Sequence, residues 1–241
     1  MAYRFDWSVL WTGQSGAWLL QGLLTTLELS ALAWLLAGAL GIAAGALRTL
    51  TTKPLRWLSG GYVEFFRNVP LLVWMFFWYF AAAPLLPRNL QDWLLAHGAE
   101  FWAGTVALGV YHGARFAEIV RAGIQSIPRT QFEAALSTGL TVAQSYRWII
   151  VPVAVRLIIP PAANESLNLL KNSSVALTIG VAELTFQTRQ IEAYTARAFE
   201  ALVAGTAIYL ALCLVVAALM ARLEKRFAIP GLTTRARLGE L

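Results

Sequence analysis

Long apolar stretches separated by short polar segments dominate the hydropathy pattern of this chain. About 20 mainly apolar residues suffice to cross a bilayer as a helix. Soluble helices keep a polar stripe, and several of these stretches have none. The pattern therefore predicts an all-α integral membrane protein that forms one domain over residues 1–241. Its five transmembrane helices are expected at about residues 19–47, 60–83, 100–124, 148–170 and 199–220.

Composition and charge support this prediction. Of the 241 residues, 58% are hydrophobic and 13% are charged, whereas soluble domains average about 25% charged residues. The net charge is +6, but the basic residues cluster in the segments between and after the apolar stretches. Lys and Arg concentrate in cytoplasmic loops of membrane proteins, so the charge indicates topology and no nucleic-acid partner. The basic segments are Arg48 to Arg56, the loop 128–147 with Arg129 and Arg147, and the tail from Arg222.

This distribution places the N-terminus outside and the C-terminus in the cytoplasm. From the N-terminal M-A-Y-R-F-D-W, no cleavable signal peptide is expected. Residues 84–98 and 171–197 are expected as external segments. The single Cys213 lies within an apolar run, where it is expected to be a small buried hydrophobe without a disulfide partner.

Glycine and proline give the spans further features. Gly38, Gly41 and Gly45 share one face of the first span and would let another helix approach closely. Pro70 is expected to bend the second span or change its direction. The fourth span carries Pro152, Pro160 and Pro161, so a kink or a break is expected there.

The polar loop 128–147 has two helix-start signals. Thr130 is followed three residues later by Glu133, and Thr141 by Gln144, which are capping-box spacings. Gly139 stands where the first helix should end. Two short helices hinged at Gly139 are therefore predicted between the third and fourth spans. Alone, this pattern fits either a docking element or an ordinary amphipathic hairpin at the membrane interface.

The loop also resembles a known family signature. Permease subunits of bacterial ATP-driven importers carry E-A-A, three residues, G, nine residues and I-x-L-P in a cytoplasmic loop. Here the matching positions are Glu133, Ala134, Ala135, Gly139, Ile149 and Pro152. Val151 replaces the usual Leu, which is a conservative departure. The resemblance implies that this loop is a coupling helix seated in a groove of the ATPase, with Glu133 as its exposed carboxylate.

Flanking stretches extend the resemblance from about residue 20 onward. They are Y-V-E-F-F-R-N-V-P-L-L-V at 62–73, A-E-I-V-R-A-G-I-Q-S-I-P at 117–128 and S-L-N-L-L-K-N-S-S-V-A-L-T-I-G at 166–180. The chain is similar to permeases of the polar-amino-acid uptake class and most resembles the glutamate/aspartate subgroup, through R-N-V-P and the long segment after the second span. This resemblance implies the fold of a type I importer permease in the bacterial inner membrane.

The resemblance also implies a complex. Two ATP-binding subunits, a second permease (a relative or another copy) and a periplasmic substrate-binding protein would accompany this chain. No G-x-x-x-x-G-K-[ST] phosphate-binding loop occurs in the sequence. ATP and Mg²⁺ are therefore expected on the partner ATPase, and this subunit is expected to be no enzyme and to carry no cofactor.

Several charges lie inside the predicted spans, where they normally face a cavity or a partner. Glu64 and Arg67 are three residues apart and are expected to pair, although Arg67 could instead meet a substrate carboxylate in the pathway. Arg115, Glu118 and Arg121 can pair along one helix face. His112 has no nearby partner in sequence, and no ligand spacing indicates a metal site.

The fourth span carries a polar stripe. Asn164, Asn168 and Asn172 recur every four residues, and Glu165 and Lys171 lie on neighbouring faces. Such alignment at membrane depth fits a water-filled substrate path, with a backbone broken at the prolines as part of the gate. Interhelical hydrogen bonding is the simpler alternative. We expect an acidic amino acid, glutamate or aspartate, to pass this stripe near Arg67 or Lys171.

Two other functions compete with import. An intramembrane serine protease would need a Ser–His pair on facing spans, and His112 is the single in-span histidine, with no G-x-S-x-G nearby. An ion-coupled carrier would be expected to show an inverted internal repeat, and none stands out. Co-purification with an ATPase chain would separate an importer subunit from both.

Overall fold

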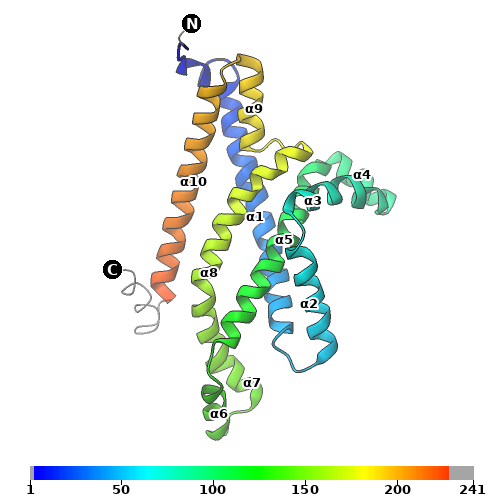
Figure 1. The fold of residues 1–241 in the computed structure, drawn as a ribbon, viewed down its shortest axis with the longest axis vertical. Helices are drawn as coiled ribbons and strands as arrows, with labels where there is room; N and C mark the ends of the chain where they lie inside the picture. Colours follow the sequence, from blue (N-terminus) through cyan, green and yellow to red (C-terminus); the bar gives the residue numbers. More distant parts are fainter. Residues whose placement is uncertain (1–2, 228–241) are drawn as a thin grey trace.

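The fold is a bundle of long helices, seen in a computed structural model that describes residues 3–227 (Figure 1). Helices α1 (Ser15–Leu47), α5 (Ala99–Gln125), α8 (Val151–Asn172) and α10 (Ala198–Phe227) run mostly along the long axis. The shorter elements are η1 (Trp7–Leu10), α2 (Lys53–Arg67), α3 (Leu71–Phe76), η2 (Phe77–Ala82), η3 (Ala83–Leu85), α4 (Arg88–Ala96), α6 (Arg129–Ser137), α7 (Val142–Ser145), η4 (Tyr146–Ile150), η5 (Ser173–Ile179) and α9 (Leu184–Thr195). No strand occurs in this described range, which agrees with the predicted all-α class.

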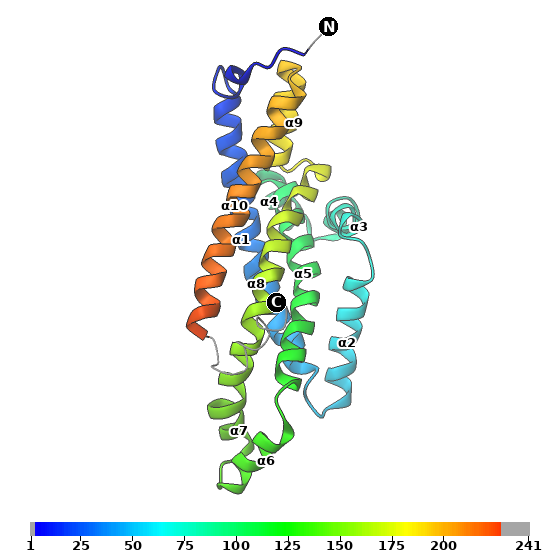
Figure 2. The same ribbon diagram turned by 60° about the vertical axis from the view of Figure 1, so that its left-hand side comes forward.

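The two ends of the bundle are built differently (Figures 1 and 2). At one end lie the start of α1, helix α9 and the start of α10. At the opposite end, α6 and α7 extend beyond the long helices. The predicted polar loop therefore lies at the end of the bundle opposite the chain's N-terminal segment, as expected for a loop that follows an odd number of spans.

Helices α1 and α5 form the centre of the bundle, and glycine sets how closely they approach. A Cβ added at Gly41 would lie 2.6 Å from Cδ1 of Phe116, and one at Gly45 would lie 2.6 Å from the carbonyl oxygen of Ala117. The predicted close approach is thus confirmed at these two glycines. Gly38 faces open space, so the prediction was wrong there. The main apolar core lies where α1, α3, α5 and η5 meet, with Leu29, Met75 and Leu108 fully buried.

Length and hydropathy single out three described stretches as able to cross a membrane: Ser15–Leu47, Val142–Ile179 and Ala198–Phe227. A fourth candidate is the pair Lys53–Arg67 and Leu71–Leu85, which bends by 102° at the break. Helix α5, with charged residues in its second half, is outside this set although it lies at the centre of the bundle. Five spans therefore stay a prediction.

The predicted second span at 60–83 was wrong as a single helix. α2 ends at Arg67, and the chain turns before α3 begins at Leu71. Pro70 has extended backbone angles (φ −58°, ψ 141°), and a residue that precedes proline is disfavoured in the helical region. Both effects stop the helix, so the expected change of direction at Pro70 is confirmed.

Two further expectations need correction. The segment 84–98, expected as a short external loop, contains helix α4. Helix α8 continues through Pro160 and Pro161 without a break. Proline removes a backbone donor, but its fixed φ near −65° is itself helical, so a helix packed along its length can contain it. The basic tail beyond Phe227 lies outside the described residues.

Candidate functional site

The candidate site has two parts, and the first is the loop region, residues 128–152. Helix α6 ends in a left-handed turn at Gly139, where φ is +87°. The amide of Gly139 donates to the Leu136 carbonyl at 2.9 Å, and that of Leu140 donates to the Ala135 carbonyl at 3.4 Å. These two bonds form a Schellman motif. The predicted hinge at Gly139 therefore has the backbone geometry that favours glycine.

Only one of the two predicted capping boxes is present. The Thr141 hydroxyl accepts from the Gln144 amide at 3.3 Å, and the Gln144 side chain accepts from the Thr141 amide at 2.8 Å, which caps α7. Thr130, by contrast, lies inside α6, whose N-cap is Pro128, and makes no capping bond. The Thr130–Glu133 box was therefore wrong, because proline with extended ψ already takes the N-cap position two residues earlier.

The loop region is seated on the bundle by apolar contacts. Ala135 is buried, and the Phe132 ring meets that of Tyr146 edge-on with 5.7 Å between centroids. A small core of Ile127, Ile150 and Ala154 lies where α5 leads into the loop and α8 begins. Glu133, Ala134, Gly139 and Pro152 remain exposed.

An open cavity of about 680 Å³ adjoins this loop. Its walls include Thr49 and Thr51 from the α1–α2 connection, Phe132 and Glu133 from α6, and Arg129. Of the sequence-predicted loop residues, Glu133 thus lines a concave surface, whereas Ala135 helps to hold α6 in place. The arrangement presents a short helix with an exposed carboxylate beside a cleft.

The second part is the polar cluster, which consists of His112 and Arg115 on α5 and Glu165 and Asn172 on α8. Oε1 of Glu165 lies 2.7 Å from Nδ1 of His112 and accepts from Nε of Arg115 at 2.9 Å. Nε2 of His112 lies 3.2 Å from Nδ2 of Asn172. Neutral His112 with its proton on Nδ1 satisfies all of these contacts, because it donates to the carboxylate and accepts from the amide.

Burial distinguishes the members of the predicted stripe. Glu165 is 4% exposed and His112 is 0% exposed. Asn164 and Lys171 are exposed, and Asn168 and Asn172 are half-buried. The stripe therefore divides into an inner part tied to α5, formed by Glu165 and Asn172, and an outer part formed by Asn164, Asn168 and Lys171. His112, expected without a partner, is the residue that sequence reasoning missed.

A second set of charges surrounds Glu118 of α5. Its Oε2 lies 2.6 Å from Nη1 of Arg48 at the end of α1 and 4.0 Å from Nη1 of Arg67 at the end of α2. Its Oε1 pairs with Arg121, one turn along α5. One carboxylate thus holds arginines from three helices, which we call the Glu118 cluster.

The Glu118 cluster changes two predicted ion pairs. Arg67 contacts Glu118, and Glu64 instead accepts from the side-chain Nδ2 of Asn68 at 3.2 Å, so the predicted Glu64–Arg67 pair was wrong. Arg115 pairs with Glu165 on α8 and not with Glu118. The predicted pair of Glu118 with Arg121 is confirmed. In the first two cases a partner on another helix replaces the neighbour in sequence.

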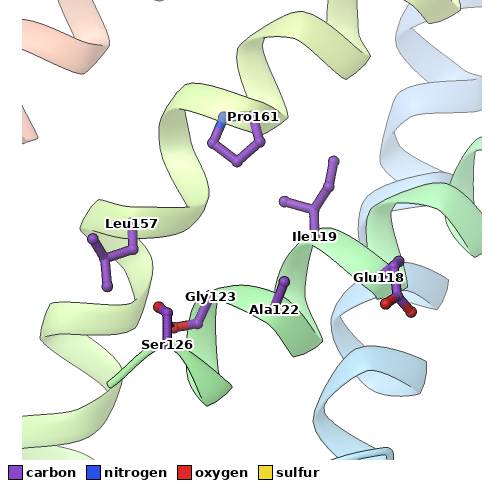
Figure 3. A pocket seen from close by; sticks show the side chains of 7 residues that line it. All are labelled: Glu118, Ile119, Ala122, Gly123, Ser126, Leu157 and Pro161. Carbon is purple, nitrogen blue, oxygen red and sulfur yellow. Dashed lines mark hydrogen bonds between the residues drawn. The ribbon is translucent and has the colours of Figure 1, made fainter. Parts of the chain in front are cut away.

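Figure 3 shows a cavity of about 400 Å³ between α5 and α8, between the Glu118 cluster and the loop region. Its lining is mostly apolar: Ile119, Ala122 and Gly123 come from α5, and Leu157 and Pro161 from α8. Glu118 and Ser126, both from the α5 side, are the polar residues of its lining. Across residues 3–227, no three His, Cys, Asp or Glu side chains gather in an arrangement that could hold a metal ion.

Comparison with known proteins gives consistent findings. The family described as "Binding-protein-dependent transport system inner membrane component" matches residues 37–229. The chain is 39% identical over 218 residues to "Glutamate/aspartate import permease protein GltJ" of Escherichia coli (strain K12), with 89% of each chain covered. It is also 39% identical over 207 residues to "Probable glutamine ABC transporter permease protein GlnM" of Bacillus subtilis (strain 168), covering 86% of this chain and 92% of that one.

Among solved structures, "Crystal structure of an amino acid ABC transporter with histidines" matches with a TM-score of 0.79 and 32% identity. The match covers 93% of this chain and 100% of that one.

Proposed function

This chain belongs to the family of binding-protein-dependent transport system inner membrane components, and from that premise we propose that it imports glutamate or aspartate as one of two permease subunits around a shared path. Its relatives are permeases of amino-acid ABC transporters, so its own class is a transport subunit. A partner ATPase would supply the energy, and a periplasmic protein would deliver the amino acid. The second permease would be a related chain or another copy.

A surplus of positive charge around Glu118 and Glu165 supports an acidic substrate. Arg48, Arg67 and Arg121 surround Glu118, and Arg115 pairs with Glu165. Four arginines thus meet two carboxylates, an excess of two positive charges. An anionic side chain that leaves water needs a fixed cation or donors to replace its hydration. Arg67 and Arg115, with side chains 40% and 41% exposed, are accessible for this purpose.

The burial pattern refines the predicted path. We propose that Asn164, Asn168 and Lys171, the outer part of the stripe, face the amino acid, with Arg67 nearby. Glu165 and Asn172 are then positioning residues, which hold α8 against His112 and Arg115 of α5. The substrate path would then run along the outer side of α8 and not between α5 and α8.

Glutamine is the second candidate substrate, because the chain is as similar to a glutamine permease as to a glutamate/aspartate permease. Uptake of labelled glutamate into proteoliposomes that hold the full complex, with unlabelled aspartate, glutamine, histidine or arginine as competitors, decides between them. Aspartate should compete best. Stronger competition by glutamine or by a basic amino acid would contradict the acidic assignment and leave the permease assignment intact.

We propose that the loop region docks on the ATPase. Its support is an exposed carboxylate at Glu133, a cleft beside it and a hinge fixed by backbone bonds at Gly139. Ala134 and Pro152, also exposed, would contribute to the contact, whereas Ala135 anchors α6 from within. ATP hydrolysis by the partner would then move α5 and α8 through the apolar contacts at their ends.

We further propose that the loop region faces the cytoplasm and the N-terminus faces the periplasm. The basic residues on the α1–α2 connection and the loop region support this orientation. With Cys213 replaced, a membrane-impermeant maleimide added outside intact cells should label Asn89→Cys and spare Lys53→Cys. Both positions are exposed, so the reverse labelling would overturn the topology.

A further inference from the structure

We propose that helix α4 and the start of α5 form a binding site for the acyl chain of a membrane phospholipid. A cavity of about 280 Å³ lies between η2, η3, α4 and α5, close to the lower end of the roughly 300–1,000 Å³ that ligand pockets span. No charged side chain lines it. The ligand it can hold is therefore apolar. Its walls are Trp78, Ala82, Ala83, Leu86, Leu90, Trp93, Leu94, Ala99, Trp102, Ala103 and Val106.

Helix α4 has two distinct faces, and the apolar one closes this cavity. Leu90, Trp93 and Leu94 follow the i, i+3, i+4 spacing and line the cavity. By helical spacing Arg88 and Asp92 lie on the opposite side of the helix, and both are exposed. A short helix of this kind lies in the plane of a membrane interface, with its apolar face toward the acyl chains. Tryptophan is itself enriched at that level of the bilayer.

Side-chain bonds hold α4 in this position. Nε2 of Gln91 donates to the Leu86 carbonyl at 2.7 Å, which ties the helix to the turn before it. The Trp93 ring lies 5.4 Å from the Trp102 ring of α5, centroid to centroid. The cavity is thus framed by fixed contacts, although most of α4 is exposed. It is a preformed recess rather than a gap left by a loose segment.

The surroundings identify the occupant. The family match places the chain in a membrane, and the apolar wall of the cavity continues onto an exposed apolar surface. Leu85 is 84% exposed, Leu95 is 76% exposed and Phe80 is 63% exposed. A second recess of about 350 Å³ adjoins the first and shares Ala83, Leu94 and Ala99 with it. A lining without charged side chains offers no ionic partner to a polar ligand, and an acyl chain needs none.

Photocrosslinking tests this proposal on the complete transporter in lipid nanodiscs. The probe is a phosphatidylcholine or a phosphatidylglycerol with a diazirine on one acyl chain, and mass spectrometry maps the labelled residues. Residues 78–106 should be labelled several-fold more than exposed apolar residues of α1 or α10 with both headgroups, because the cavity recognises the chain. Labelling that is even along all apolar surfaces would overturn the site.

Two variants and one control make the result specific. Ala103→Phe fills the cavity. Leu90→Asp places a charge in its wall, and because Leu90 is 40% exposed, this variant should fold even if the first does not. Either should reduce labelling of residues 78–106 to the level of the other surfaces. Leu35→Phe alters a residue 70% exposed on α1 and should leave the labelling unchanged. Protein–protein crosslinks at residues 78–106 to the second permease or the binding protein, in place of lipid labelling, would also overturn the proposal.

Discussion

The loop region and the polar cluster are both polar parts of an apolar bundle, but they are stabilised in opposite ways. In the loop region, hydrogen-bond partners lie within five residues of each other: Gly139 with Leu136, and Thr141 with Gln144. In the polar cluster, Glu165 is 53 residues from His112 and 50 from Arg115. The loop region is held by local hydrogen bonds at an exposed end of the bundle. The polar cluster joins two long helices through the buried Glu165. Substitutions in the loop region should therefore change its local shape, whereas substitutions in the polar cluster should weaken the packing of α5 against α8.

The largest effect is expected from Glu165→Ala. It leaves the fully buried His112 without its acceptor and Arg115 without its counter-ion. A buried donor left without its acceptor costs about 1–3 kcal/mol, and Arg115, with a side chain 41% exposed, can be solvated in part. The unfolding midpoint of the purified complex should therefore fall, measured by fluorescence-detected size exclusion.

Two further variants define the cause. Glu165→Leu combined with His112→Leu removes both polar partners and should recover part of the loss, because no buried group is then left unpaired. Asn164→Ala changes the exposed neighbour and should leave the midpoint unchanged. An unaltered midpoint in Glu165→Ala would show that the cluster does not hold α5 to α8.

A smaller but more specific effect is expected from Gly139→Ala. An added Cβ would meet nothing within 4 Å, so the whole effect comes from the positive φ. The left-handed conformation costs about 1–2 kcal/mol for a residue with a side chain, which lowers the population of the observed turn roughly 5- to 30-fold. Stimulation of ATPase activity by loaded binding protein should fall while the complex remains assembled.

The matched control is Gly61→Ala, which also adds a methyl group in open space but in helix α2 at negative φ. It should keep full stimulation. Glu133→Ala should reduce stimulation without altering the turn. Unreduced stimulation in both Gly139→Ala and Glu133→Ala would contradict a docking role for the loop region.

The smallest effect is expected from Thr141→Ala, which removes the capping box of α7. Loss of an N-cap costs about 1 kcal/mol, so amides of residues 142–145 should exchange hydrogen roughly fivefold faster in mass spectrometry. Thr130→Ala is the control, because Thr130 is equally exposed but caps nothing. Equal exchange in both variants would show that the box does not stabilise α7.

The same contrast explains what could be predicted from sequence. The end of α6 and the start of α7 follow from residues three or four apart, which spacing reveals. The Thr130 box failed because Pro128 competes for the same role two residues earlier. The partners of His112, Arg115 and Arg67 lie on other helices, and no spacing along the chain encodes which helix faces turn toward each other. Helices α4 and α9 were missed because they are short and lie beside long apolar stretches that dominate the hydropathy.

Helix α5 is not among the stretches that hydropathy singles out as membrane spans, and this has a consequence for its insertion. α5 is made before α8, so His112 and Arg115 leave the ribosome about 50 residues ahead of Glu165. A charged residue at the centre of a lone inserting helix costs roughly 2.5–3.5 kcal/mol. Helix α1, already synthesised, supplies Gly41, Gly45 and Arg48 as a surface against which α5 can settle. The order of synthesis therefore lets α5 pack against α1 before α8 is made and its Glu165 can pair with Arg115.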